Sequence, residues 1–216
     1  SWISFRRKAP RRRVGRGENG DSYRRDGVVV ILDGGMGHLL RRNGVDISGP
    51  IGTMERFRGV ARANRDSPDI VLHSHLQFLR SGADVITTNT YACVPAALAT
   101  DGGGSPDDVM ELIQAGGALA ARARDIAVSE GLSHARPLVA GCLPPLHETY
   151  RPDRVGDYDE LASTYRMIVD AVAPSSDVLL CETMHSTAEA FAAAEAANAV
   201  GLPVWVSFTV SEADAG

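Results

Sequence analysis

The feature that most constrains the fold is an alternation, from residue 28 onward, of short apolar runs with longer segments of helical periodicity. Such an alternation is typical of βαβ units, which build a parallel sheet. Each run is almost continuously apolar, as expected for strands buried on both faces, and it ends in small or polar residues. The five runs are residues 28–35, 84–91, 137–145, 177–184 and 202–210. The sequence therefore predicts an α/β fold with a parallel sheet of about five strands.

The segments between these runs carry signals for helix starts. At Ser67 and Ser105 a hydroxyl residue precedes a proline, which is favoured at the first helical position. Asp157 and Ser186 each stand three residues before a glutamate, which is the spacing of a capping box. The Gly-, Pro- and Arg-containing stretch 41–66 predicts a loop before the next helix. One apolar stripe at helical spacing is predicted to pack on the sheet; it consists of Val109, Leu112, Ile113, Gly116, Ala120, Ala123 and Ala127.

Chain length limits the number of domains. The 216 residues are enough for one α/β domain, since single domains usually contain ~100–200 residues and barrels ~250. Five strands by residue 210 leave an eight-stranded barrel about three βα units short, whereas an open, doubly wound sheet needs no further strands. The spacing of the strands alone is compatible with both. We expect one folded domain over residues 27–216.

Charge is distributed unevenly along the chain. Residues 1–25 carry nine basic and two acidic side chains, whereas the whole chain has a net charge of -5, so the remainder is strongly acidic. An acidic domain argues against a nucleic-acid partner, because phosphate binding depends on clustered Lys and Arg. The apolar runs are far shorter than the ~18 residues of a membrane span, so we expect no membrane segment.

The basic N-terminal segment, residues 1–26, is expected to be disordered and to lie outside the folded domain. It lacks the apolar core of a secretory signal, and the three cysteines are widely spaced, which favours a cytoplasmic protein. An organelle is the alternative, since an Arg-rich N-terminus is also typical of a transit peptide. Residue 1 is Ser rather than Met, and residues 211–216 follow directly on a strand-like run, so we expect a fragment of a longer protein.

Polar residues at three strand ends are candidates for chemistry. Asp33 ends the first run, and the two glycines that follow allow either close approach of a ligand to the backbone or simply a tight turn. Glu182 interrupts an apolar run, and a buried carboxylate needs either a structural partner or a cationic ligand. Residues 87–91 offer donors and acceptors, or form a turn. If Asp33 and Glu182 both face the mouth of the fold, together they can hold an ammonium group.

Histidine and cysteine do not follow the pattern of a metal site. His73 and His75 are two residues apart, which places them on nearly opposite sides of a helix. Cys93, Cys142 and Cys181 form no CxxC pair, and a tetrahedral zinc site needs three or four convergent ligands. We therefore expect buried free thiols and no metal ligand within this chain.

Five sequence blocks together resemble the homocysteine S-methyltransferase family in order and spacing. They are LDGGMGHLL, SPDIVLHSHLQFLRSGADVITTNTY, LVAGCLPPLHETYRP, DVLLCETMHSTAEAFAAAEAA and LPVWVSFTV, within residues 28–210. The resemblance implies a TIM (β/α)8 barrel, here incomplete, with about the first five strands present. It also implies an enzyme of methionine synthesis in which a zinc-bound homocysteine thiolate attacks a methyl donor. Zinc favours this reaction because it lowers the pKa of the thiol, and the thiolate is the nucleophile.

The resemblance also implies roles for individual residues. Asp33 is expected to bind the ammonium group of homocysteine, and the backbone amides of Gly34 and Gly35 its carboxylate. Glu182 is similar to the family's second ammonium-binding acid. The remaining substrate-binding residues would line the mouth of the barrel; they are Asn89, Thr90 and Tyr91. No catalytic acid, base or metal ligand is assigned within the chain.

The chain departs from the family at the metal site. The family's three zinc cysteines would lie beyond Gly216, so zinc is implied for the full-length protein and this chain by itself is expected to be inactive. Members that resemble it use S-methylmethionine or S-adenosylmethionine as the methyl donor, while others use betaine or folate. A non-catalytic remnant that binds an amino acid or a partner chain is the alternative, and a metal-independent lyase would need a base that the sequence does not reveal. The sequence does not indicate an oligomeric state.

Overall fold

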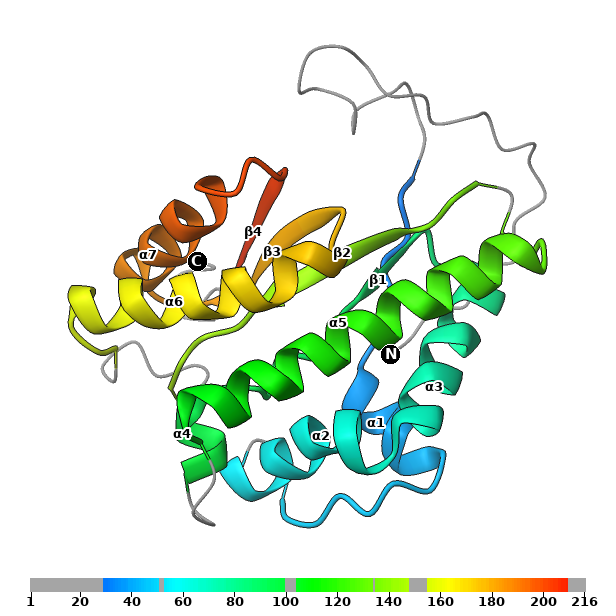
Figure 1. Cartoon of the computed structure of the whole chain (residues 1–216), viewed down its shortest axis with the longest axis horizontal. Helices are drawn as coiled ribbons and strands as arrows, with labels where there is room; N and C mark the ends of the chain where they lie inside the picture. Colours follow the sequence, from blue (N-terminus) through cyan, green and yellow to red (C-terminus); the bar gives the residue numbers. More distant parts are fainter. Residues whose placement is uncertain (1–28, 51–52, 100–103, 134, 148–154, 210–216) are drawn as a thin grey trace, which may run out of the picture.

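A parallel β-sheet and the helices that pack on it make up the structure, a computed structural model that describes residues 29–50, 53–99, 104–133, 135–147 and 155–209 (Figure 1). The basic segment 1–26 lies outside the described residues. The sheet contains strands β1 (Val85–Thr87), β2 (Leu138–Leu143), β3 (Val178–Met184) and β4 (Val204–Phe208). They are parallel and follow one another in chain order, as βα units do in a barrel.

The first predicted strand is reduced to one bridge beside β1. Leu32 forms an isolated parallel bridge with Val85, and the amide of Asp33 donates to the Val85 carbonyl at 3.0 Å. The prediction of a full strand over residues 28–35 was therefore too long, and residue 28 lies outside the described part. The pairing stops because the chain enters a helix at Met36, directly after two glycines. The segment still occupies the place of a strand at one edge of the sheet.

Helices connect all of these strands. They are α1 (Met36–Arg42), α2 (Met54–Asp66), α3 (Pro68–Arg80), α4 (Pro95–Leu98), α5 (Pro106–Ser129), α6 (Tyr158–Val172), the 3-10 helix η3 (Ala173–Ser175) and α7 (Thr187–Asn198). Three of the four predicted caps accept a backbone hydrogen bond through the side chain, namely Ser105, Asp157 and Ser186. Ser67 is the N-cap of α3, but its side chain makes no capping bond.

The largest error of the sequence analysis concerns residues 41–66, which we expected to form a loop. Helix α2 occupies the second half of this stretch. Thr53 caps it, because its hydroxyl accepts a hydrogen bond from the amide of Arg56, and Glu55 adds an acid in the first turn. The four arginines of the helix obscured its amphipathic pattern, in which Ala61 and Asn64 are buried.

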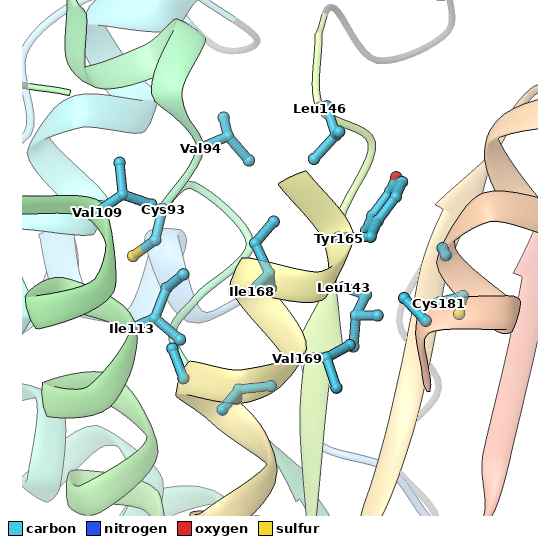
Figure 2. Close-up of a cluster of buried hydrophobic side chains, with 14 of the residues drawn as sticks. Cys93, Val94, Val109, Ile113, Leu143, Leu146, Tyr165, Ile168, Val169 and Cys181 are labelled. Atoms are coloured by element: carbon cyan, nitrogen blue, oxygen red, sulfur yellow. The ribbon is translucent and has the colours of Figure 1, made fainter. Parts of the chain in front are cut away.

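The two faces of the sheet have separate cores. Because side chains alternate along a strand, Ile86, Val139 and Leu179 point to the face that carries the helices. Figure 2 shows side chains of α6 meeting α5 and the strands on this face, including the ring of Tyr165. A smaller apolar cluster covers the opposite face; it consists of Val85, Ala140, Val178 and Leu180. The predicted stripe of α5 is buried as expected.

Both edges of the described sheet carry exposed apolar side chains. Phe208 on β4 is 55% exposed and Leu32 is 43% exposed. The architecture is the partial α/β barrel that the sequence predicts, with the strand ends free to form a site. None of the described helices is long and apolar enough to cross a membrane.

Candidate active site

A cleft of about 430 Å³ opens at the carboxyl ends of the first strands. Asp33, Gly34 and Gly35 line it from the segment beside β1, and Glu182 lines it from β3. With Asn89 and Tyr91, which follow β1, six of the seven residues proposed from the sequence meet in one place, although they are up to 149 positions apart in the chain. The ligand sites of parallel α/β folds lie at this end of the strands, because the loops there are not needed to close the sheet.

Asp33 is partly buried in the cleft wall, and among the described residues Thr87 holds its carboxylate. The backbone amide of Thr87 donates to Oδ2 at 2.8 Å, and the Thr87 hydroxyl donates to Oδ1 at 2.9 Å. Burial raises the pKa of Asp33 to about 7, the Thr87 hydrogen bonds oppose this rise, and the nearby Glu182 charge adds to it. An acid that titrates near neutral pH changes its charge readily when a cation enters.

Glu182 reaches the same cleft because of an irregularity in β3. The register between β3 and β4 shifts between Cys181 and Met184, and Thr183 adopts a left-handed backbone conformation with φ of 61°. The carboxylate accepts a hydrogen bond from the Cys142 thiol at 3.2 Å. Burial raises the pKa of Glu182, and the thiol bond opposes the rise. The strained residue directly follows the acid, as is common at functional sites.

The two glycines lie where there is little room for a side chain. A Cβ atom at Gly34 would lie 3.3 Å from the Phe78 ring, and one at Gly35 would lie 3.3 Å from the His38 ring. Both residues line the cleft through their backbone. A larger residue would displace these neighbours, so the glycines also let a ligand reach the main chain.

The remaining predicted site residues, which follow β1, differ in their positions. Tyr91 lines the cleft, with its ring edge-on to Phe57 at 6.0 Å between centroids. Asn89 also borders the cleft, but its amide donates to Asn64 Oδ1 at 2.8 Å and to the Val60 carbonyl at 3.0 Å. Thr90 is buried away from the cleft lining. Asn89 and Thr90 thus hold the loop in place.

Sequence reasoning missed the wall that α2 contributes. Arg56, Phe57 and Val60 line the cleft from this helix, in the stretch that we expected to be a loop. A signal was present, because Arg56, Val60 and Asn64 follow one another at a spacing of four, which places a charged residue on the inner face of a helix.

The cysteines are buried and free, as predicted, in the core behind the cleft. Burial raises the pKa of Cys93 and of Cys181 to about 12 and that of Cys142 above its ordinary value, so all three remain thiols. Among the described residues, no three His, Cys, Asp or Glu side chains come together as a metal site. The described residues therefore do not by themselves provide for a zinc ion.

Comparison with known proteins decides the family. The family model described as homocysteine S-methyltransferase matches residues 30–216, which is most of the chain. The chain belongs to the homocysteine S-methyltransferase family. This confirms the resemblance drawn from the sequence blocks.

Individual members of the family are distant from this chain in sequence. Homocysteine S-methyltransferase 1 of Brassica oleracea is 28% identical over 207 residues, which cover 88% of this chain and 60% of the relative. Homocysteine S-methyltransferase of Escherichia coli is 26% identical over 196 residues, with 86% of this chain and 60% of the relative covered. The chain thus spans about 60% of the length of these relatives.

Solved structures match the fold. The metallated form of the homocysteine methyltransferase MmuM from Escherichia coli superposes with a TM-score of 0.73 at 27% identity, over 84% of this chain and 63% of that one. The apo form of the same enzyme gives 0.64 at 25% identity. Both are homocysteine methyltransferases with a TIM-barrel fold, so the parallel sheet described above is a part of that barrel.

Proposed function

We propose that this chain forms the homocysteine-binding part of a homocysteine S-methyltransferase. In this reaction the thiol sulfur of homocysteine loses its proton and takes a methyl group from a small sulfonium donor, S-methylmethionine or S-adenosylmethionine. The homocysteine sulfur becomes the thioether of methionine, and the donor sulfur keeps the electron pair of the broken carbon–sulfur bond and becomes a neutral thioether. The observation that carries the proposal is a pair of partly buried carboxylates, Asp33 and Glu182, that line one cleft, with no cation among the causes that shift their pKa values. Family membership supports the same conclusion.

The two acids fit the ammonium group of an amino acid. Burying carboxylates without a counter-charge is unfavourable, and an incoming ammonium group removes that cost. Thr87 fixes the direction of Asp33, and Cys142 fixes that of Glu182. A bound cation favours the ionised form of both acids, so Asp33 gives up its proton as the ligand enters.

The backbone of Gly34 and Gly35 is the proposed partner of the homocysteine carboxylate. Both glycines border the cleft next to Asp33, and no side chain stands between their main chain and a ligand. An amino acid held at its ammonium and carboxylate groups has only its side chain free. The thiol of homocysteine would then be directed away from these residues toward the donor.

Zinc is part of the proposal only for the longer protein. The family's chemistry uses zinc to lower the pKa of the homocysteine thiol. The described cysteines are deeply buried thiols that do not fit this ion, so we propose that its ligands belong to other residues. The steps assigned to this chain are binding and orientation of homocysteine and acceptance of its ammonium charge.

The proposal is tested by titrating the chain with L-homocysteine in a calorimeter under reducing conditions. Replacing Asp33→Asn or Glu182→Gln should weaken binding about 10- to 100-fold, because each change removes one charge-assisted hydrogen bond. Glu111→Gln, an exposed acid on α5, serves as the matched control and should bind like the wild type. Wild-type binding that persists unchanged in both cleft variants would contradict the assignment.

A further inference from the structure

Arg56 is a buried cation whose role in the fold is not explained by its contacts. Only 6% of the residue is exposed, and it lines the same cleft as Asp33 and Glu182. No hydrogen bond or ion pair joins its guanidinium to any of the residues that the structure describes. Its nitrogens are not among the buried polar atoms without a partner, which means that they remain accessible from the cleft.

Holding the guanidinium in this place opposes folding in two ways. A largely buried charge without a protein partner loses part of its hydration and gains no ion pair in return. Arg56 is also the third residue of α2, next to the positive end of the helix dipole, where a cation is unfavourable and an anion is favoured. Both effects disappear when an anion binds beside the guanidinium.

Among the described residues, no ion pair joins Arg56 to Asp33 or Glu182, although all three line the same cleft. Burial raises the pKa values of both acids, against hydrogen bonds from Thr87 at Asp33 and Cys142 at Glu182. An adjacent cation would lower the pKa of Glu182, but the Arg56 charge is not among the causes of its shift. The cleft thus carries two carboxylates and a guanidinium that is not paired with either of them.

We propose that Arg56 binds the carboxylate group of an amino-acid substrate in this cleft. The inference rests on the proposed function, because both homocysteine and the sulfonium donors are amino acids. The groups already assigned to homocysteine favour the donor: homocysteine is held at Asp33, Glu182 and the glycine amides in the proposed function, and the donor's carboxylate is left for the guanidinium. A planar guanidinium suits a carboxylate because it can donate two parallel hydrogen bonds.

The test measures the binding of ligand pairs that differ only by the carboxylate. S-Methylmethionine is compared with its decarboxylated analogue, aminopropyl dimethylsulfonium, and homocysteine with aminopropanethiol, each titrated calorimetrically into the wild type and Arg56→Gln. We expect Arg56→Gln to weaken S-methylmethionine binding about 10- to 100-fold and to leave the binding of its decarboxylated analogue unchanged. A loss confined to homocysteine would place the homocysteine carboxylate on Arg56 instead, and would also support the inference.

Controls separate this role from a structural one. Arg62→Gln removes the same charge from the same helix at a position outside the cleft lining and should leave all four titrations unchanged. Arg56→Lys keeps the charge and should retain part of the affinity. Because the native guanidinium is unpaired, Arg56→Gln should melt at or above the wild-type temperature. Equal affinities of wild type and Arg56→Gln for all ligands would overturn this inference alone, whereas a wild type that binds none of them would overturn the proposed function as well.

Discussion

Two aspartates at opposite ends of the same sheet have opposite environments. Asp177, directly before β3, accepts hydrogen bonds from Arg124 at 3.1 Å, Arg136 at 2.9 Å and the Val139 amide at 2.9 Å. These contacts outweigh the effect of its burial and lower its pKa. Asp33, at the carboxyl end, has only Thr87 as a partner, and its pKa is raised to about 7.

Under the proposed function, this difference separates acids that stabilise the fold from acids that bind a ligand. At the amino end of the strands, the carboxylate is neutralised by the protein's own cations, so its charge stabilises the folded chain. At the carboxyl end, no ion pair joins Asp33 or Glu182 to a cation among the described residues, and the ligand that we propose would remove this disadvantage. Residues at the two ends of barrel strands divide between stability and function in this way.

The largest expected effect is a difference in stability between a variant of Asp177 and a variant of Asp33. Asp177→Asn removes the acid that pairs with both Arg124 and Arg136, leaves Arg124 with Asp125 alone among the described residues, and should lower the free energy of unfolding by about 2 kcal/mol. Asp33→Asn removes an unneutralised buried charge while an amide can still bond to Thr87, so stability at pH 7 should stay equal or rise. Urea denaturation of both variants measures this.

The same comparison has a pH dependence of known sign. A carboxyl group whose pKa is lowered by folding stabilises the protein above its ordinary pKa, and this contribution is lost as the pH falls. The difference in the free energy of unfolding between the wild type and Asp177→Asn should therefore shrink when denaturation is repeated near pH 3. If both aspartate variants lose the same free energy of unfolding at pH 7, the two ends of the sheet do not differ in how their acids affect stability.

A smaller effect is expected at the strained residue beside Glu182. Thr183 is β-branched and has a positive φ, so Thr183→Gly should raise the free energy of unfolding by about 1 kcal/mol. Thr187→Gly, in the first turn of α7, is the control and should destabilise the chain instead, because glycine is unfavourable in a helix. If Thr183→Gly is as destabilising as the control, the backbone at Glu182 is not strained.

Much of this architecture could be predicted from the sequence, because the alternation of apolar runs and capped helices follows from local chemistry. The strands β1 to β4, three of the caps and the pair Asp33 and Glu182 were identified in this way. Residues with mixed signals were harder: α2 contains four arginines, and the stretch leading into it contains glycines and a proline, so it resembled a loop.

The remaining features depend on long-range contacts. The Asn89 amide donates a hydrogen bond to Asn64 of α2, which lies 25 positions earlier in the chain. The break in register after Cys181 that accompanies Glu182 depends on pairing with β4. The spacing of Arg56, Val60 and Asn64 indicates an inner helix face, but that this face borders a cleft depends on the fold. No local pattern of residue types contains this information.

The most direct test of the central claim is the affinity for L-homocysteine as a function of pH between 5 and 8. The claim is that Asp33 must be ionised to hold the ammonium group, and its pKa in the free protein is about 7. The account predicts that affinity rises toward pH 7 by up to about tenfold per pH unit, levels off above it, and is accompanied by proton release at pH 6. An affinity that is constant over this range, with no proton released, would contradict it.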